Sequence, residues 1–206
     1  MSVAQEHIHG HGDIEAHHEE HQKIKMFGFW LFVSTDMILF ACLFATYLVL
    51  RNHTDGGPTP QQIFDVPGFT EETFLLLTSS FTGGLATLAS RNGKKNQVVG
   101  WLIVTILLGL GFVGLELKEF LADIHMGATA QRSGFLSAFY TLVATHGCHV
   151  SMGILWLSAT AYQVYKRGIN AVTARKIFIV NLYWHFLDVV WVLIFTVVYL
   201  SGVTLP

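Results

Sequence analysis

Residues 181–199, NLYWHFLDVVWVLIFTVVY, are apolar enough to cross a bilayer, yet they carry a histidine and a carboxylate in the middle of the run. His185 and Asp188 are three residues apart, and Asn181 lies four residues before His185, so a helix places all three on one face. An aspartate that faced lipid would be costly, so this polar face should contact other protein or a wet cavity. The stretch predicts a membrane helix that packs through its polar face.

The composition of the whole chain also indicates a membrane protein. Of its 206 residues, 52% are hydrophobic and only 13% are charged. The net charge of -2 gives no basic surface for nucleic acid. The only two cysteines, Cys42 and Cys148, fall in separate apolar runs, where a thiol behaves as a small hydrophobic group. We therefore expect neither a structural disulfide nor a CxxC metal or redox site.

Several apolar runs are long enough to span a bilayer, which takes about 20 helical residues. We expect five transmembrane helices, over residues 26–50, 73–90, 98–119, 134–165 and 177–202. The second is the least apolar, because Thr, Ser and Gly dilute it. The fold class predicted is thus an all-α membrane bundle, with an exposed loop over residues 51–70.

Residues 1–22 differ from the rest, because they are almost free of apolar side chains. We expect a disordered tail, followed by a membrane domain over residues 23–206, with no cleaved signal peptide. The tail contains His7, His9, His11, His17, His18 and His21. Histidine has an ordinary pKa of about 6.5, so near neutral pH these side chains could act as a proton antenna. A solvated tail without a role, or adventitious metal binding by its first three histidines, are the alternatives.

The positive charges are distributed unevenly between the two ends of the predicted spans, which predicts an orientation. Nine of the twelve Lys and Arg residues fall on the N-terminal side: Lys23, Lys25, Arg91, Lys94, Lys95, Lys166, Arg167, Arg175 and Lys176. The other three are Arg51, Lys118 and Arg132. The positive-inside rule then places the N-terminus in the cytoplasm and the C-terminus outside.

Polar residues inside the predicted spans are candidates for function. They are Asp36, Glu116, Glu119, His146, His149, His185 and Asp188. A structural network of interhelical hydrogen bonds would use them, and so would a proton or ion path. A metal site needs at least three converging groups, and a bis-histidine haem could use His149 with His185. The spacing alone leaves these alternatives open.

Five motifs in order resemble one known family. They are FGFWLFVSTDMILFACLFATYLVL, ETFLLLTSSFT, LLGLGFVGLELKEF, RSGFLSAFYTLVATHGCHV and LYWHFLDVVWVLIFTVVYL. Together they resemble subunit III of the haem-copper terminal oxidases, and among these the five-helix form found in cytochrome o ubiquinol oxidases. The resemblance covers residues 27–202.

The resemblance implies an accessory subunit without a catalytic centre, haem, copper or other metal of its own. Subunit I would hold the haems and copper, and subunits II and IV and membrane phospholipid would be further partners. The family's buried acid falls on Asp36, its paired histidines on His146 and His149, and its His-x-x-Asp on His185 and Asp188. Its carboxylates in the third span fall on Glu116 and Glu119. The family also implies a lipid-holding cleft, with the first two spans leaning away from the other three.

The expected function is therefore that of a non-redox subunit III in a proton-pumping quinol oxidase of a bacterial inner membrane. The complex would oxidise quinol and reduce dioxygen to water, while this chain supports subunit I and binds lipid, with a part in proton uptake as a further candidate role. A haem b membrane anchor or a small transporter are the alternatives. The sequence does not identify the electron donor, because the donor surface would lie on other subunits.

Overall fold

Every long apolar run is helical in the computed structural model, which describes the backbone of residues 3–57, 59, 63 and 66–204. A helix satisfies its backbone hydrogen bonds internally, as a segment surrounded by lipid must. Within those residues, five helices are long and apolar enough to cross a membrane, and no strand is formed. The predicted all-α fold with five spans is confirmed.

The helices follow the predicted spans closely. They are α1 (Val3–Leu50), α3 (Val66–Arg91), α4 (Lys95–His125), α5 (Gly134–Arg167) and α6 (Ala171–Ile194). A π-helix, η1 (Phe195–Leu200), and the short α7 (Ser201–Thr204) continue α6. The largest difference inside the membrane is the start of α3, at Val66 instead of residue 73. The acidic residues just before 73 look like loop residues in the sequence, but Glu72 is only 1% exposed.

The backbone of the predicted disordered tail differs from expectation, because α1 begins at Val3 and runs without a break into the first span. Residues 3–25 contain no proline and several Ala, Gln and Glu residues, which favour helix. The side chains of the six tail histidines lie outside the described part of the structure. The proton antenna and the domain boundary at residue 22 therefore stay predictions.

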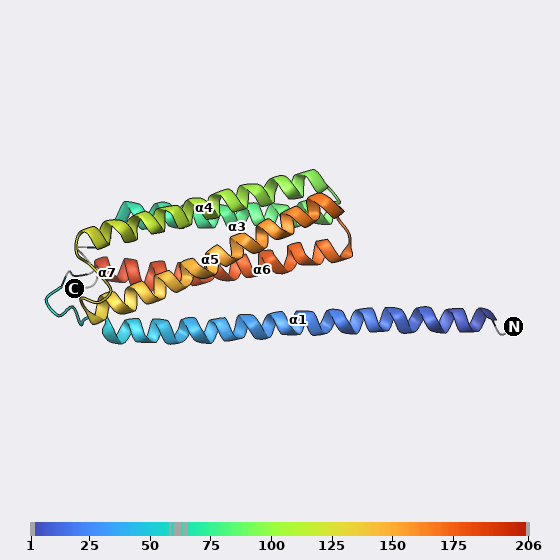
Figure 1. The fold of residues 1–206 in the computed structure, drawn as a ribbon, viewed down its shortest axis with the longest axis horizontal. Helices are drawn as coiled ribbons and strands as arrows, with labels where there is room; N and C mark the ends of the chain where they lie inside the picture. Colours follow the sequence, from blue (N-terminus) through green and yellow to red (C-terminus); the bar gives the residue numbers. More distant parts are fainter. Residues whose placement is uncertain (1–2, 58, 60–62, 64–65, 205–206) are drawn as a thin grey trace. The chain divides into compact units, whose positions relative to one another are not determined.

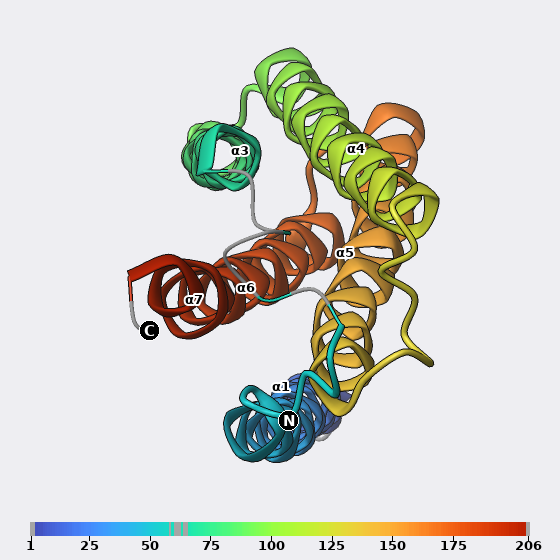
Figure 2. The same ribbon diagram turned by 90° about the vertical axis from the view of Figure 1, so that its left-hand side faces the viewer.

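The chain divides into two units, Met1–Leu39 and Phe40–Pro206. In the second unit, α3, α4, α5 and α6 form a four-helix bundle (Figures 1 and 2). Each helix packs on the next in the chain, and α6 packs back on α3. The expectation that the second span leans away from the last three is wrong, because α3 packs along both α4 and α6.

Short connections with specific caps hold the bundle in its order. Asn170 begins α6 with a capping box, in which its side chain accepts from the backbone N–H of Thr173 and the Thr173 hydroxyl accepts from the Asn170 N–H. Ser133 caps α5 by accepting from the N–H of Leu136. Gly168 adopts a φ of 72° at the end of α5, a conformation that suits glycine.

Trp184 on α6 lies at the centre of the bundle and contacts all three other helices. Its ring lies where a Cβ at Gly109 on α4 would come within 2.8 Å, and one at Gly153 on α5 within 3.0 Å. Its Nε1–H donates to the hydroxyl of Ser79 on α3 at 2.9 Å. Glycine therefore permits the close approach of α4 and α5 to this indole. By contrast, a Cβ at Gly114 would meet nothing within 4 Å.

Candidate functional site

The contact between α3 and α6 is made by four hydrogen-bonded side-chain pairs. Each pair joins a hydroxyl residue of α3 to a polar side chain of α6. The pairs are Thr73 with Trp191 (3.0 Å), Ser79 with Trp184 (2.9 Å), Ser80 with His185 (2.6 Å) and Thr87 with Asn181 (2.9 Å). From Thr73 to Thr87 on α3, the partner on α6 changes from Trp191 to Asn181, so the two helices run antiparallel. These bonds satisfy polar groups that lipid could not satisfy.

The polar face predicted for residues 181–199 lies on the α3 side of α6. Asn181 donates through Nδ2 to the Thr87 hydroxyl, and the Nδ1 of His185 shares a hydrogen bond with Ser80. The Ser80 hydroxyl also lies within reach of the Asp188 carboxyl. Asn181 and Asp188 are 3% and 7% exposed, whereas the ring of His185 is exposed on this chain. The structure thus brings this predicted set together against one helix.

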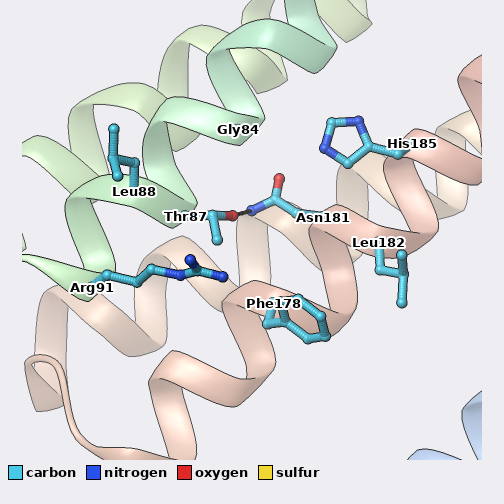
Figure 3. A pocket seen from close by; sticks show the side chains of 8 residues that line it. All are labelled: Gly84, Thr87, Leu88, Arg91, Phe178, Asn181, Leu182 and His185. Atoms are coloured by element: carbon cyan, nitrogen blue, oxygen red, sulfur yellow. Dashed lines mark hydrogen bonds between the residues drawn. The ribbon is translucent and has the colours of Figure 1, made fainter.

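A groove lies between the ends of α3 and α6, and Figure 3 shows the eight residues that line it. Its volume is about 270 Å³. We call it the α3–α6 groove. Arg91, the last residue of α3, extends toward Phe178 below the Thr87–Asn181 bond (Figure 3). One nitrogen of the His185 ring points toward Asn181 (Figure 3). The groove therefore combines a cation, a histidine and an amide with apolar walls.

A second group of polar residues is acidic and lies where α3 faces α4. Glu72 of α3 and Glu119 and Asp123 of α4 line a cavity of about 300 Å³, with the exposed Lys118 at its edge. Glu72 and Asp123 are 1% and 2% exposed. One carboxyl oxygen of each has no hydrogen-bond partner. Buried carboxyl groups of this kind are typical of functional positions in membrane proteins.

Glu116, one turn before Glu119, turns toward α5 and lies against a glycine. Its carboxyl group occupies the space where a Cβ at Gly147 would come within 2.7 Å. Glu116 is 4% exposed, and its Oε1 has no hydrogen-bond partner. Glu116 and Glu119, which the sequence analysis treats as a pair, therefore have different surroundings. Of the two, only Glu119 lines the acidic cavity.

Sequence reasoning missed two members of the acidic group. Asp123 follows Glu116 by seven residues and Glu119 by four, a helical spacing that could have indicated it. Glu72 precedes the inward-facing Ser79 by seven residues, which is the same signal on α3. Glu72 was not predicted, because the acidic stretch before residue 73 looks like part of a loop.

His146 and His149 of α5 have different surroundings although they share a helix face. His146 is fully buried among rings, with its ring centroid 5.4 Å from Trp191 and 5.9 Å from Phe112. Neither nitrogen of His146 has a hydrogen-bond partner. The Nδ1–H of His149 donates to the Thr145 carbonyl at 2.7 Å. His146 therefore acts here as an aromatic packing group.

The pair His149 and His185, considered for a bis-histidine haem, does not share a cavity. Tyr183 of α6 points toward α5, where its hydroxyl reaches the His149 carbonyl at 3.5 Å. His185 follows Tyr183 by two residues, about 200° around the helix, and it faces α3. The two histidines thus lie on different sides of α6. Among the side chains that the structure describes, no group of three or more His, Cys, Asp or Glu residues is placed to hold a metal ion.

Asp36 lies in the first unit and is only 7% exposed. It belongs to the first span, about 15 Å along the helix from Met26. Cys42 and Cys148 are both free thiols on exposed positions, as expected for cysteines in apolar runs. Neither cysteine belongs to the polar groups described above.

Five apolar helices, two of which are joined by hydrogen bonds between polar side chains, define a multi-pass membrane protein. The chain belongs to the cytochrome c oxidase subunit III family, whose model matches residues 3–203. The match extends beyond the five motifs of residues 27–202 and includes most of the histidine-rich tail.

Curated relatives resemble the chain over nearly its whole length. Quinol oxidase subunit 3 of Bacillus subtilis (strain 168) is 48% identical over 93% of this chain and 96% of the relative. Cytochrome bo(3) ubiquinol oxidase subunit 3 of Pseudomonas aeruginosa is 47% identical over 97% and 95%, respectively. Cytochrome c oxidase subunit 3 of Bacillus sp. (strain PS3) is 49% identical over 87% of each chain. The names of the relatives thus divide between quinol and cytochrome c oxidases.

Proposed function

We propose that this chain is the accessory subunit III of a respiratory haem-copper quinol oxidase, a complex that oxidises quinol, reduces dioxygen to water and pumps protons. The observation that carries the proposal is the similarity, at 48% identity over 93% of the chain, to a protein named quinol oxidase subunit 3. Relatives of similar identity carry the name cytochrome bo(3) ubiquinol oxidase subunit 3. Relatives named cytochrome c oxidase subunit 3 reach similar identity, but they match 87% of the chain, whereas the quinol oxidase subunits of Bacillus subtilis and Pseudomonas aeruginosa match 93% and 97%. We assign quinol as the donor class on this longer match.

The role assigned to the chain itself is structural and not redox. The contacts of its polar residues support this assignment. Asn181 and His185 join α6 to α3, and His146 packs among aromatic rings. Haems and copper belong to subunit I in this proposal, and subunits I, II and IV are the protein partners. Membrane phospholipid is the remaining partner.

The proposed location is a bacterial inner membrane, with the N-terminus in the cytoplasm and the C-terminus outside. The charge distribution supports this orientation. The antiparallel bundle brings the α3–α4 and α5–α6 connections to one end, and both connections are basic. In a chain without Cys42 and Cys148, single cysteines in these connections should react with impermeant maleimide only from the cytoplasmic side, and a cysteine near the C-terminus only from the outside. Reaction of both from the same side would contradict the orientation.

Oxygen uptake by membranes tests the donor class. Membranes that contain the complex should consume oxygen with a short-chain ubiquinol or menaquinol as donor, and they should not do so with reduced cytochrome c. A membrane without the complex is the control. Oxygen uptake that depends on reduced cytochrome c alone would overturn the assignment to quinol oxidases, while leaving membership of the family intact.

A further inference from the structure

The acidic cavity between α3 and α4 contains carboxyl groups that this chain leaves unpaired. Glu72 of α3 and Glu119 and Asp123 of α4 line it. Glu72 and Asp123 are 1% and 2% exposed, and Oε2 of Glu72 and Oδ2 of Asp123 have no hydrogen-bond partner. A buried carboxyl oxygen without a partner is costly, whether or not the group is ionised. The two oxygens therefore indicate a ligand that the chain alone does not supply.

The described side chains around the cavity do not pair with these two oxygens. Lys118 is the only cation among the described residues that line it, and its side chain is exposed. The Tyr140 hydroxyl lies within reach of the Asp123 carboxyl, but it donates its proton to the Ala128 carbonyl at 2.8 Å. A hydroxyl has one proton to donate, so Tyr140 has none left for Asp123. Residues 52–70, which lead into α3, contain no Lys or Arg.

The charge at this end of the bundle specifies the sign of the ligand. Glu72 lies about 9 Å along the helix from the first residue of α3, and Asp123 lies about 3 Å from the last residue of α4. Residues 51–72 and 116–133, which flank the cavity in the sequence, contain seven Asp and Glu residues but only three Lys and Arg residues. Water could bond the unpaired oxygens, but it would not offset the repulsion between negative charges. A cation that approaches from the aqueous surface would do both.

The placement of the carboxyl groups favours a guanidinium over a metal ion. Among the described side chains, no three His, Cys, Asp or Glu residues are placed to hold a metal ion. The two unpaired oxygens belong to different helices, so a single ligand has to reach across the α3–α4 contact to serve both. A guanidinium carries five N–H donors in a planar fork and can donate to two carboxyl groups, whereas an ammonium is a compact, strongly hydrated charge. Arginine is therefore the side chain that matches the cavity.

The size and the walls of the cavity also suit an arginine side chain. Its volume is about 300 Å³, while one molecule of liquid water occupies about 30 Å³, so a whole side chain can enter. Ile63, Leu115 and Met126 add apolar walls, against which the methylene groups of an arginine can pack. Glu71 and Lys118 also line the cavity and are exposed, so its mouth is open on this chain.

We infer that the acidic cavity receives the guanidinium of an arginine from a neighbouring subunit of the complex, and that this contact holds the chain in the complex. The guanidinium donates to Oε2 of Glu72 and to Oδ2 of Asp123. The inference goes beyond the proposed function and rests on it only in requiring that the chain is a subunit of a complex. Under the proposed orientation, the arginine belongs to a segment of that subunit at the outer surface of the membrane.

The rate at which the chain leaves the purified complex tests this contact. The complex is held on a resin through a tag on a different subunit, and the chain that detergent and salt release is measured over time. Loss of one partner from a buried charge contact mainly speeds dissociation, so we expect Glu72→Gln and Asp123→Asn each to speed release about tenfold or more. Asp55→Asn, which removes an exposed acid outside the cavity, is the matched control and should leave the rate unchanged. Lys118→Gln should also leave it unchanged.

A photoreactive amino acid in place of Met126, which lines the cavity and is exposed, identifies the occupant without removing a carboxyl group. It should crosslink to a peptide of another subunit that contains an arginine. Replacement of that arginine by glutamine should speed release as Glu72→Gln does, and the two changes together should speed release no further than either change alone. A crosslink only to lipid, a crosslink to a peptide without arginine, or additive effects of the two changes would overturn the inference.

Three further results would also overturn the inference. Release of both cavity variants at the rate of the unchanged complex would show that the carboxyl groups make no such contact. Faster release of Lys118→Gln would show that this chain's own lysine fills the cavity. Slower release in calcium or magnesium, seen in the unchanged complex but not in Glu72→Gln, would show that an inorganic cation does so. In each case the unchanged chain still copurifies with the complex, whereas a chain that never does so would contradict the proposed function itself.

Discussion

Ser80 on α3 and His185 on α6 share a hydrogen bond of 2.6 Å, although 105 residues separate them in the chain. The bond joins the second span to the fifth. It also fixes the His185 ring, so that one nitrogen serves the helix contact and the other faces the α3–α6 groove (Figure 3). The packing of α3 on α6 and the polar wall of the groove therefore depend on one side chain.

Removal of the Ser80 hydroxyl should weaken the α3–α6 contact. Interhelical hydrogen bonds in membrane proteins contribute about 0.6 kcal/mol on average and up to about 1.7 kcal/mol. We expect a double-mutant cycle of Ser80→Ala and His185→Ala, measured by unfolding in mixed micelles, to give a coupling energy in this range. Ser151→Ala removes a hydroxyl that bonds only the Gly147 carbonyl of its own helix, and it should show no coupling with His185→Ala. Equal coupling in the two cycles would contradict the described contact.

Gly109→Ala should destabilise the bundle, because the added methyl would lie 2.8 Å from the ring of Trp184. Trp184 is fully buried and cannot move away without disturbing α3 and α5. Overpacking of this kind costs about 1–3 kcal/mol. Gly114→Ala on the same helix is the control, since nothing lies within 4 Å of the added methyl. Thermal denaturation of the two variants should rank Gly109→Ala well below Gly114→Ala, and equal values would argue against the close approach.

Asp36 is expected to serve the stability of the subunit and not proton conduction. Asparagine keeps the shape and hydrogen-bonding ability of the side chain, so Asp36→Asn should assemble and turn over normally. Asp36→Leu removes the hydrogen bonds of a residue that is 7% exposed, so it should weaken assembly. Proton pumping measured in proteoliposomes decides between the roles, because a proton-conducting aspartate would require the Asn variant to lose pumping.

Deletion of residues 2–22 should leave assembly unchanged and alter only proton delivery. A histidine of ordinary pKa exchanges protons near neutral pH, and the proposed orientation places the six tail histidines on the cytoplasmic side, where we expect protons to be taken up. Oxygen consumption should then fall mainly at high pH and low buffer, and added mobile buffer should restore it. Replacement of the six histidines by glutamine, with the rest of the tail intact, should reproduce the effect. An unchanged pH dependence of oxygen consumption would contradict the antenna hypothesis.

The sequence predicts the spans and the polar face of α6, because both follow from helical periodicity within one segment. It did not predict that α3 is the helix that packs against this polar face. The choice of partner depends on which hydroxyls of α3 meet Asn181 and His185, and such pairing between distant segments leaves no local pattern. Glu72 was also missed, because it lies just before the predicted span, at the end of a stretch that resembles a loop.

The different surroundings of two glycines on α4 could be predicted from the sequence. Gly109 and Gly114 are five residues apart and point about 140° away from each other, so they cannot both face Trp184. The π-helix η1 could not be predicted from the sequence. It depends on a shift in backbone hydrogen bonding, which side-chain periodicity does not reveal. It places Tyr199 in the core, with its ring centroid 5.0 Å from that of Phe69 on α3.

The distribution of haem within the purified complex decides whether this chain is a subunit without haem or copper of its own. A tagged chain, isolated in mild detergent, is analysed for haem and copper before and after it is released from its partners by stronger detergent. We expect haem and copper to copurify with the tagged chain in the intact complex and to remain with the other subunits after release. Haem or copper that stays on the released chain, or a tagged chain that never copurifies with a haem-copper protein, would contradict the account.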